Sequence, residues 1–170
     1  PDLRVLDVGC GPGALTSELA RRVGAGAVTA VDPSPGFVEA ARERNPEVDV
    51  RRAEAEQLPF DDDSFDAALA QLVVHFMTDP AAGIAEMRRV TRRGGVVTAC
   101  VWDHAGGAGP LARFWDAARE LAPGVADESG LPGAREGDLE RILREAGLGD
   151  VDERLLTVEV EHSSFEEWWE

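Results

Sequence analysis

Three glycines alternate within one short stretch of this chain, and they constrain its fold more than any other feature. The stretch from Val5 to Thr16 reads VLDVGCGPGALT, with an apolar run, then Gly9, Gly11 and Gly13, then a helix-forming segment. A short apolar run bounded by turn residues is typical of a strand that is covered on both faces. Glycine is needed where the backbone adopts positive φ or lies directly against a ligand. The stretch therefore predicts a buried strand, a tight turn and a helix.

The remainder of the chain alternates between apolar runs and helical patterns, which predicts an α/β domain with a mainly parallel sheet. Six apolar runs are candidates for strands: Arg4–Val8, Ala27–Val31, Val48–Arg51, Asp66–Val73, Gly95–Trp102 and Val151–Val160. The first five are short and mostly unalternating, as expected for strands with helices on both faces. The last alternates apolar and polar residues, so we expect an edge strand there.

The sequence also indicates where several helices begin and end. Ser34-Pro35 and Asp79-Pro80 each place a capping side chain before a proline suited to the first helical position. One apolar stripe with helical spacing ends before Gly147, and it consists of Leu139, Ile142, Leu143 and Ala146. A second stripe consists of Leu111, Phe114, Trp115, Ala118 and Leu121. Gly- and Pro-rich loops surround that second stripe, so residues 103–137 are expected to form a loop-rich insertion.

The charge balance excludes several classes of partner. Seventeen basic residues, all arginine, face thirty-three acidic ones, for a net charge of −16. Nucleic-acid binders gain affinity from clustered Lys and Arg, so nucleic acids and anionic membranes are not expected as partners. The two cysteines, Cys10 and Cys100, form no CxxC pattern, which favours a reducing, cytoplasmic location. Asp61, Asp62 and Asp63 lack the alternation of a calcium loop, and we expect no metal there.

Two carboxylates decide what kind of ligand the glycine turn would take. Gly9, Gly11 and Ala14 fit a dinucleotide-binding pattern, with Asp32 at the end of the second strand as the ribose ligand. However, Asp7 brings a negative charge beside the turn, which is unfavourable for a diphosphate and favourable for a cation. Pro12, expected at the start of the helix, also removes an N–H that a pyrophosphate would use. A cationic ligand with a ribose fits better than a dinucleotide.

With these features, the chain resembles the class I S-adenosylmethionine-dependent methyltransferases, in particular the ubiquinone/menaquinone-biosynthesis-like group that acts on small molecules. Five segments carry the resemblance in the family's order: Val5–Thr16, Val31–Arg42, Glu54–Phe60, Asp61–Asp66 and Arg89–Val97. The resemblance implies a Rossmann-like, doubly wound, mainly parallel sheet with helices on both faces. It also implies S-adenosyl-L-methionine as the cofactor.

The resemblance assigns the methionine side of that cofactor to the first and fourth strands. Gly9, Cys10 and Gly11 would pass beneath the methionine portion, with Asp7 near its amino group. Gln71, at the end of the fourth strand, would lie under the sulfonium.

The nucleoside side is assigned to the second and third strands. Asp32 would accept hydrogen bonds from both ribose hydroxyls, and Pro33 and Phe37 would flank the adenine ring. Glu54 would receive the adenine amino group, and the backbone N–H of Ala55 would reach a ring nitrogen. Glutamate is one methylene longer than the aspartate more usual at this position.

The domain itself is expected to span residues 1–170 and to be truncated at both ends. The family has a helix before its first strand and a seventh, antiparallel strand after its sixth, and neither has a counterpart here. The chain begins with Pro1 rather than Met and ends at Glu170.

The candidates for catalysis are two histidines. His75 and His104 each follow a strand end on the ligand-facing edge of the sheet, where an imidazole could remove a proton from an acceptor. From the sequence we favour a structural role over a catalytic one for each histidine, with His75 packed beside the cofactor and His104 in a mobile loop. Trp102, Phe114 and Trp115 border the insertion at 103–137, and one of them is expected to line an acceptor pocket although helical spacing favours core positions.

The sequence therefore predicts methyl transfer from S-adenosylmethionine to a small, neutral or apolar molecule. Two alternatives stay open: an NAD-dependent oxidoreductase, and a non-catalytic cofactor-binding regulatory protein. The oligomeric state is also open, with a homodimer as one candidate.

Overall fold

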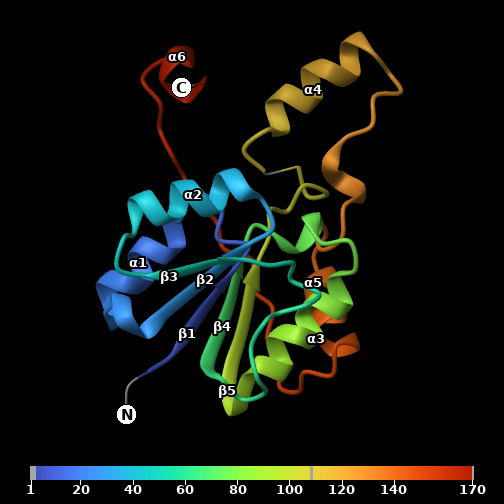
Figure 1. The fold of residues 1–170 in the computed structure, drawn as a ribbon. Coiled ribbons are helices and arrows are strands. Elements are labelled where there is room, and N and C mark those ends of the chain that lie inside the picture. Colours follow the sequence, from blue (N-terminus) through green and yellow to red (C-terminus); the bar gives the residue numbers. More distant parts are fainter. Residues whose placement is uncertain (1–2, 108, 170) are drawn as a thin grey trace.

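The centre of the molecule is a five-stranded parallel sheet. A computed structural model describes residues 3–107 and 109–169 (Figure 1). The strands lie in the order β3-β2-β1-β4-β5, and every neighbouring pair is parallel. Their bounds are β1 Val5–Val8, β2 Val28–Asp32, β3 Asp49–Arg52, β4 Phe65–Gln71 and β5 Thr91–Cys100. The first five predicted strands are therefore confirmed, each with a shift of a few residues at its ends.

Helices cover both faces of this sheet, as Figure 1 shows. On one face lie α1 (Ala14–Val23) and α2 (Pro35–Arg44). On the other lie α3 (Pro80–Val90) and α5 (Asp138–Glu145). The remaining helices, α4 (Ala112–Leu121) and α6 (Phe165–Trp169), stand away from the sheet. Three short 3₁₀ segments, η1 (Ala25–Ala27), η2 (Val74–Phe76) and η3 (Glu128–Gly130), complete the described elements. This is the doubly wound arrangement expected from the alternating pattern.

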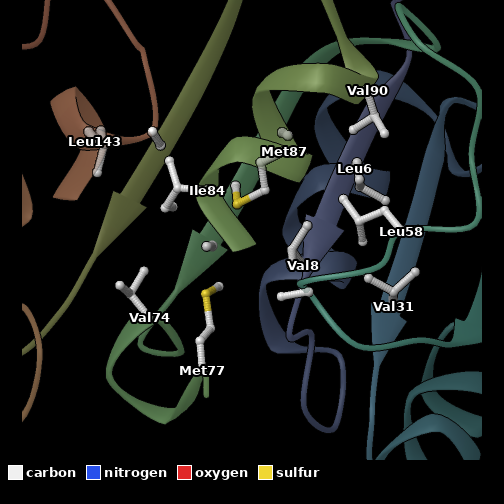
Figure 2. Packing of buried hydrophobic residues seen from close by; sticks show 14 of the residues in the cluster. Leu6, Val8, Val31, Leu58, Val74, Met77, Ile84, Met87, Val90 and Leu143 are labelled. Atoms are coloured by element: carbon white, nitrogen blue, oxygen red, sulfur yellow. The ribbon is translucent and has the colours of Figure 1, made fainter. Parts of the chain in front are cut away.

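The core consists of two layers, one on each face of the sheet. Leu6 and Val8 of β1 point into the layer beneath α3, where Ile84 and Met87 are fully buried (Figure 2). Val5, one residue along β1, belongs to the layer beneath α1 and α2. Because alternate residues of a strand face opposite sides, a strand covered on both faces is mostly apolar, and Asp7 is the exception in β1.

The capping predictions are confirmed at two helix starts. The Ser34 hydroxyl accepts a hydrogen bond from the Phe37 N–H at 3.4 Å, and α2 begins at Pro35. The Asp79 carboxylate accepts from the Ala82 N–H at 3.0 Å, and α3 begins at Pro80. These side chains satisfy N–H groups that have no partner inside the helix.

The predicted edge strand at Val151–Val160 is wrong. These residues form no strand, and Val158 and Val160 are 78% and 68% exposed. Alternation describes the two faces of a strand, but a strand also needs a neighbour that offers backbone hydrogen bonds. Within the described ranges β5 stays at the edge of the sheet, and its Val96 is 59% exposed on the side of α1 and α2.

The apolar stripe of α4 does form a helix, but not a core helix. None of its described residues is buried, and Phe114 and Leu121 are 46% and 89% exposed. Helical spacing thus predicted the element correctly and its environment wrongly. In the part of the chain that the structure describes, no helix is long and apolar enough to cross a membrane.

Candidate functional site

The glycine turn lies between β1 and α1, at the carboxyl edge of the sheet. Gly9, Gly11 and Gly13 all have positive φ, at 70°, 53° and 84°. The N–H of Gly9 donates to the carbonyl of Val31 at 2.8 Å, which ties the turn to β2. Helix α1 begins only after Gly13, so Pro12 lies in the turn. The expectation that this proline occupies the start of the helix is therefore wrong.

Two of these glycines have different neighbours. A Cβ at Gly9 would lie 2.3 Å from Cγ2 of Val73, the second residue after β4. A Cβ at Gly11 would meet nothing within 4 Å. Gly9 is thus required by close packing between the turn and the segment after β4, whereas Gly11 faces open space where a ligand can approach the backbone.

These contacts predict unequal effects of alanine. Gly9→Ala should reduce the free energy of unfolding by about 3 kcal/mol, because overlap with Val73 adds to the strain of positive φ. Gly11→Ala is the matched control and should lose only about 1 kcal/mol, because its added methyl has room. Val73→Ala in the Gly9→Ala background should recover part of the loss. Urea denaturation measures all three, and equal losses for the two alanine variants would contradict the assigned contact.

Asp7 is a buried carboxyl with a free oxygen. Its side chain is 1% exposed, and the Thr16 hydroxyl donates to Oδ2 at 2.6 Å. Oδ1 has no hydrogen-bond partner among the described residues. Burial raises the pKa of Asp7 to about 6, with Asp32 adding to the rise and the Thr16 hydrogen bond opposing it. A buried carboxylate oxygen without a donor fits a cationic N–H group of a ligand.

Asp32 stands at the end of β2 and organises the other side of the turn. Its Oδ2 accepts from the Gly11 N–H at 2.9 Å, and its Oδ1 accepts from the Ser34 N–H at 2.8 Å. Each carboxylate oxygen keeps capacity for a further hydrogen bond. Pro33 and Phe37 follow directly and are exposed, Phe37 to 50%. This is a hydrogen-bonding carboxylate flanked by apolar surface, which suits a ribose with an attached ring.

The segment after β3 lies beside Asp32. The Ala53 N–H donates to the backbone carbonyl of Asp32 at 3.2 Å, which brings the next two residues to the same edge of the sheet. Glu54 is exposed and Ala55 is buried. A free carboxylate and a neighbouring backbone N–H are the groups that could read the edge of a purine.

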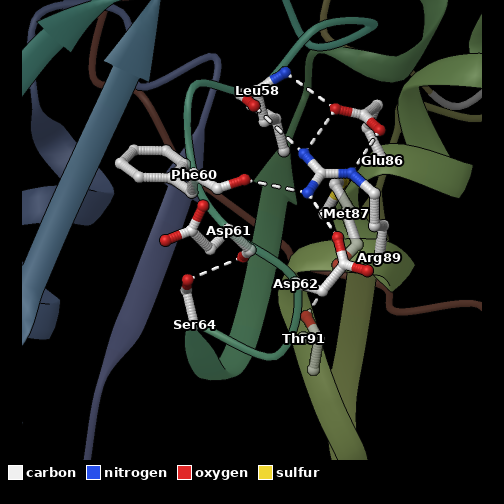
Figure 3. Close-up of polar contacts among 9 residues, drawn as sticks. All are labelled: Leu58, Phe60, Asp61, Asp62, Ser64, Glu86, Met87, Arg89 and Thr91. Atoms are coloured by element: carbon white, nitrogen blue, oxygen red, sulfur yellow. Dashed lines mark hydrogen bonds and ion pairs between the residues drawn. The ribbon is translucent and has the colours of Figure 1, made fainter.

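An arginine network holds the loop that follows (Figure 3). Arg89 of α3 donates to the carbonyls of Phe60 and Leu58 at 2.8 and 3.1 Å, and it contacts Asp62 at 2.8 Å. Glu86 accepts from Arg89 at 2.6 Å and from the Leu58 N–H at 2.9 Å. These hydrogen bonds lower the pKa of Glu86, and they anchor the loop after Ala55 to α3. Sequence reasoning missed this network, because its partners are far apart in the chain.

The two histidines lie together, His75 in η2 after β4 and His104 in the loop after β5. His75 is 6% exposed, its ring centroid is 5.8 Å from that of His104, and its Nδ1 has no partner among the described residues. His104 lies in the loop after β5, as expected, and its side chain is only 8% exposed. Gln71 is exposed at the end of β4. The structure therefore brings both candidate bases into one cluster.

Sequence reasoning missed a further member of this cluster. Oε2 of Glu128, in η3, lies 3.5 Å from Nδ1 of His104 and accepts a hydrogen bond from Nε1 of Trp115 at 3.0 Å. His104, Trp115 and Glu128 line a small cavity of about 30 Å³. Trp102 and Phe114 are 42% and 46% exposed and do not line it. No local pattern connects Glu128 with His104, since a loop and a helix separate them.

Comparison with known proteins gives a family match. Residues 6–99 match the family model described as a methyltransferase domain, which covers the glycine turn, Asp32 and strands β1 to β5. The match is therefore confined to the part of the chain that forms the sheet.

Named relatives agree with this match. A chloroplastic 2-methyl-6-phytyl-1,4-hydroquinone methyltransferase of Oryza sativa is 42% identical over 96 residues, which are 55% of this chain and 28% of the relative. A demethylmenaquinone methyltransferase of Renibacterium salmoninarum is 36% identical over 104 residues, 61% of this chain and 43% of the relative. A SAM-dependent methyltransferase structure from Thermotoga maritima superposes with a TM-score of 0.63 at 27% identity, covering 86% of this chain and 64% of that one. The chain spans less than half the length of the two sequence relatives.

Proposed function

Because this chain belongs to the methyltransferase domain family, we propose that it transfers the methyl group of S-adenosylmethionine to a small, neutral or apolar acceptor. The observation that carries the proposal is the pair of carboxylates around the glycine turn. Asp7 offers a buried oxygen without a donor, and Asp32 offers hydrogen-bonding oxygens beside exposed apolar side chains. Asp7 suits a cationic amino group, and Asp32 suits a ribose.

The residues present fit this cofactor. Gly9, Cys10 and Gly11 would carry its methionine portion, and Gly11 has open space above its Cα. Gln71, exposed at the end of β4, would lie near the sulfonium. Asp7 would hold the amino group. When bound, the cofactor supplies a methyl group that is already activated by the positive sulfur.

The nucleoside would lie across the ends of β2 and β3. Asp32 would hold the ribose hydroxyls, and Pro33 and Phe37 would enclose the adenine ring. Glu54 and the backbone N–H of Ala55 would read the edge of that ring. The Arg89 network keeps the loop after Ala55 in place, so these contacts would be organised before the cofactor arrives.

The acceptor would be bound by the insertion at 103–137. Both named relatives from Oryza and Renibacterium carry names of quinol or quinone methyltransferases, which supports a small acceptor. The net charge of −16 favours a neutral acceptor over an anionic polymer, and the pair of unlinked cysteines favours a cytoplasmic protein. The protein's contribution would be to align the acceptor with the methyl group and to exclude water.

Calorimetric titration and a methyl-transfer assay test this function. We expect S-adenosylhomocysteine to bind and NAD not to bind, because the turn carries the Asp7 carboxylate. Labelled methyl groups from S-adenosylmethionine should appear on at least one member of a panel of small hydroxyl, amine and carbon-acid acceptors. Binding of NAD without binding of S-adenosylhomocysteine would reject the proposal in favour of an oxidoreductase. Binding of S-adenosylhomocysteine without any transfer would favour a regulatory protein.

A further inference from the structure

The cluster of His75 and His104 lies at a defined place in the sheet. Gln71 and Cys100 are opposite each other at the ends of β4 and β5, and the Leu72 N–H donates to the carbonyl of Cys100 at 2.8 Å. Each histidine follows its strand by the same short interval, so the two rings meet beyond the carboxyl edge. They pack edge to face, with an interplanar angle of 75°.

This place adjoins the glycine turn. His75 belongs to η2, and Val73, directly before η2, fills the space above Gly9. The histidine cluster is therefore separated by one short segment from the residues that would carry the methionine portion of the cofactor. An acceptor that approached the methyl group from outside that portion would pass beside the cluster.

A carboxylate oxygen of Glu128 lies next to the His104 ring. This oxygen, Oε2, lies 3.5 Å from Nδ1 of His104, and the Trp115 N–H holds the same oxygen at 3.0 Å. The side chains of His104 and Glu128 are 8% and 29% exposed. A carboxylate that faces Nδ1 keeps a proton on that nitrogen, and the lone pair is then on Nε2. An imidazole in this state is a proton acceptor.

The other charged groups around the cavity are engaged elsewhere. Asp127 accepts from the backbone N–H of Ser129 at 3.0 Å and pairs with Arg119, and Arg119 also contacts Asp116 at 3.0 Å. Burial and the neighbouring His104 lower the pKa of His75. Glu128 is therefore the carboxylate that acts on His104.

We propose that His104 accepts a proton from the methyl acceptor, that Glu128 is its positioning residue, and that the acceptor carries a phenolic or enolic hydroxyl. This proposal rests on the methyltransferase function proposed above. In the step, the hydroxyl proton passes to Nε2 of His104 while the hydroxyl oxygen bonds to the methyl carbon. The carbon–sulfur bond breaks, and its electron pair stays on sulfur. The products are a methyl ether, S-adenosylhomocysteine and an imidazolium that returns its proton to water.

The acceptor class follows from what a base can contribute. A neutral amine attacks with a free lone pair and loses its proton afterwards, so a base adds little to its transfer step. A hydroxyl becomes a strong nucleophile only as its proton leaves, and a positioned base then accelerates the reaction by about 10²–10⁴-fold. The arrangement of His104 and Glu128 is useful for a hydroxyl and of little use for an amine.

Nitrogen NMR tests the arrangement without any acceptor. In protein labelled with ¹⁵N-histidine, with signals assigned through single His→Gln variants, neutral His104 should carry its proton on Nδ1. Glu128→Ala should shift it toward the Nε2–H form, whereas Glu43→Ala, at an exposed position of α2, should not. An Nε2–H form in the wild type, or no response to Glu128→Ala, would overturn the proposal.

Kinetics with paired probes test the role and the acceptor class. Substituted phenols and the corresponding anilines are offered with S-adenosylmethionine, and we expect transfer to phenols. His104→Gln should lower kcat about 100- to 1,000-fold for a phenol that is protonated at the assay pH. The loss should be less than about 10-fold for 4-nitrophenol at a pH where it is already ionised, because no proton then remains to be removed. Equal losses for both phenols, transfer to anilines alone, or no transfer to any phenol would overturn the proposal.

The positioning role of Glu128 has its own readout. Glu128→Gln should lower kcat about 10-fold for the protonated phenol and by less than about 2-fold for ionised 4-nitrophenol, because Glu128 acts only through the proton transfer to His104. Glu43→Gln, at an exposed position of α2, should change neither rate. An equal loss of kcat for both phenols would show a merely structural role and overturn the assignment of Glu128. Calorimetry with S-adenosylhomocysteine separates the two proposals: loss of its binding in the wild type rejects the methyltransferase function, while retained binding with a failed histidine test rejects only this inference.

Discussion

Asp32→Ala should weaken the binding of S-adenosylhomocysteine by at least about 100-fold, equivalent to about 2.7 kcal/mol at 25 °C. The carboxylate would lose its hydrogen bonds to the ribose, and charge-assisted hydrogen bonds are stronger than neutral ones. The substitution would also leave the N–H groups of Gly11 and Ser34 without their acceptor. Both effects reduce affinity, because the turn would no longer be held in the conformation that faces the ligand.

Isothermal titration calorimetry measures this loss, and Asp49→Ala is the matched control. Asp49 begins the neighbouring strand β3 and pairs with Arg51 on the surface, with both side chains about half exposed. Its removal should leave the affinity unchanged, since exposed ion pairs contribute little. Thermal denaturation of Asp32→Ala shows whether the fold persists. An unchanged affinity in a folded Asp32→Ala protein would mean that the ribose does not lie at β2.

Asp7→Asn should have opposite effects on stability and on binding. The pKa of Asp7 rises from 3.8 to about 6 on folding, so the folded state binds more protons than the unfolded state between these values. Stability therefore falls as the pH rises from about 4 to 6, by about 3 kcal/mol in total. An asparagine carries no charge at any pH and can still accept from Thr16. Above pH 6 the ligand-free variant should be more stable than the wild type by about 3 kcal/mol.

The same change should weaken cofactor binding by about 10- to 100-fold, because a cationic amino group would lose its carboxylate. Urea denaturation of both ligand-free proteins at pH 4, 5, 6, 7 and 8 measures the stability difference, which should vanish near pH 4. Asp49→Asn is the control and should show no such pH dependence. Stability curves for the wild type and Asp7→Asn that run parallel from pH 4 to 8 would contradict the assigned burial of the charge.

The sheet and its first helices follow from local signals in the sequence. The short apolar strands, the glycine turn and the caps at Ser34 and Asp79 could each be predicted from a few neighbouring residues. The structure confirms these elements. The alternating segment at 151–160 failed because alternation does not say which strand would pair with it. The same limit applies to α4, whose spacing defines an apolar face but not what covers that face.

In the candidate site, too, some residues could be predicted from local sequence and others could not. Asp7 and Asp32 could be singled out because each stands at a strand end beside the turn. Glu128 could not, since only the folding of the insertion brings it to His104. Arg89 was equally hidden, because two of its contacts are to backbone carbonyls, which any residue type supplies, and Asp62 is far from it in the chain.

The absence of any buried residue among those described in α4 has a consequence for how such proteins diverge. The carboxylates around the glycine turn belong to strands that pack on both faces, so substitutions there disturb the core. The helix that would face the acceptor contributes nothing to that core, and most substitutions on it should change stability by less than about 0.5 kcal/mol. Acceptor choice can therefore drift during evolution while cofactor use stays fixed. Because substitutions in α4 cost little stability, the same fold can change its acceptor without compensating substitutions in the core.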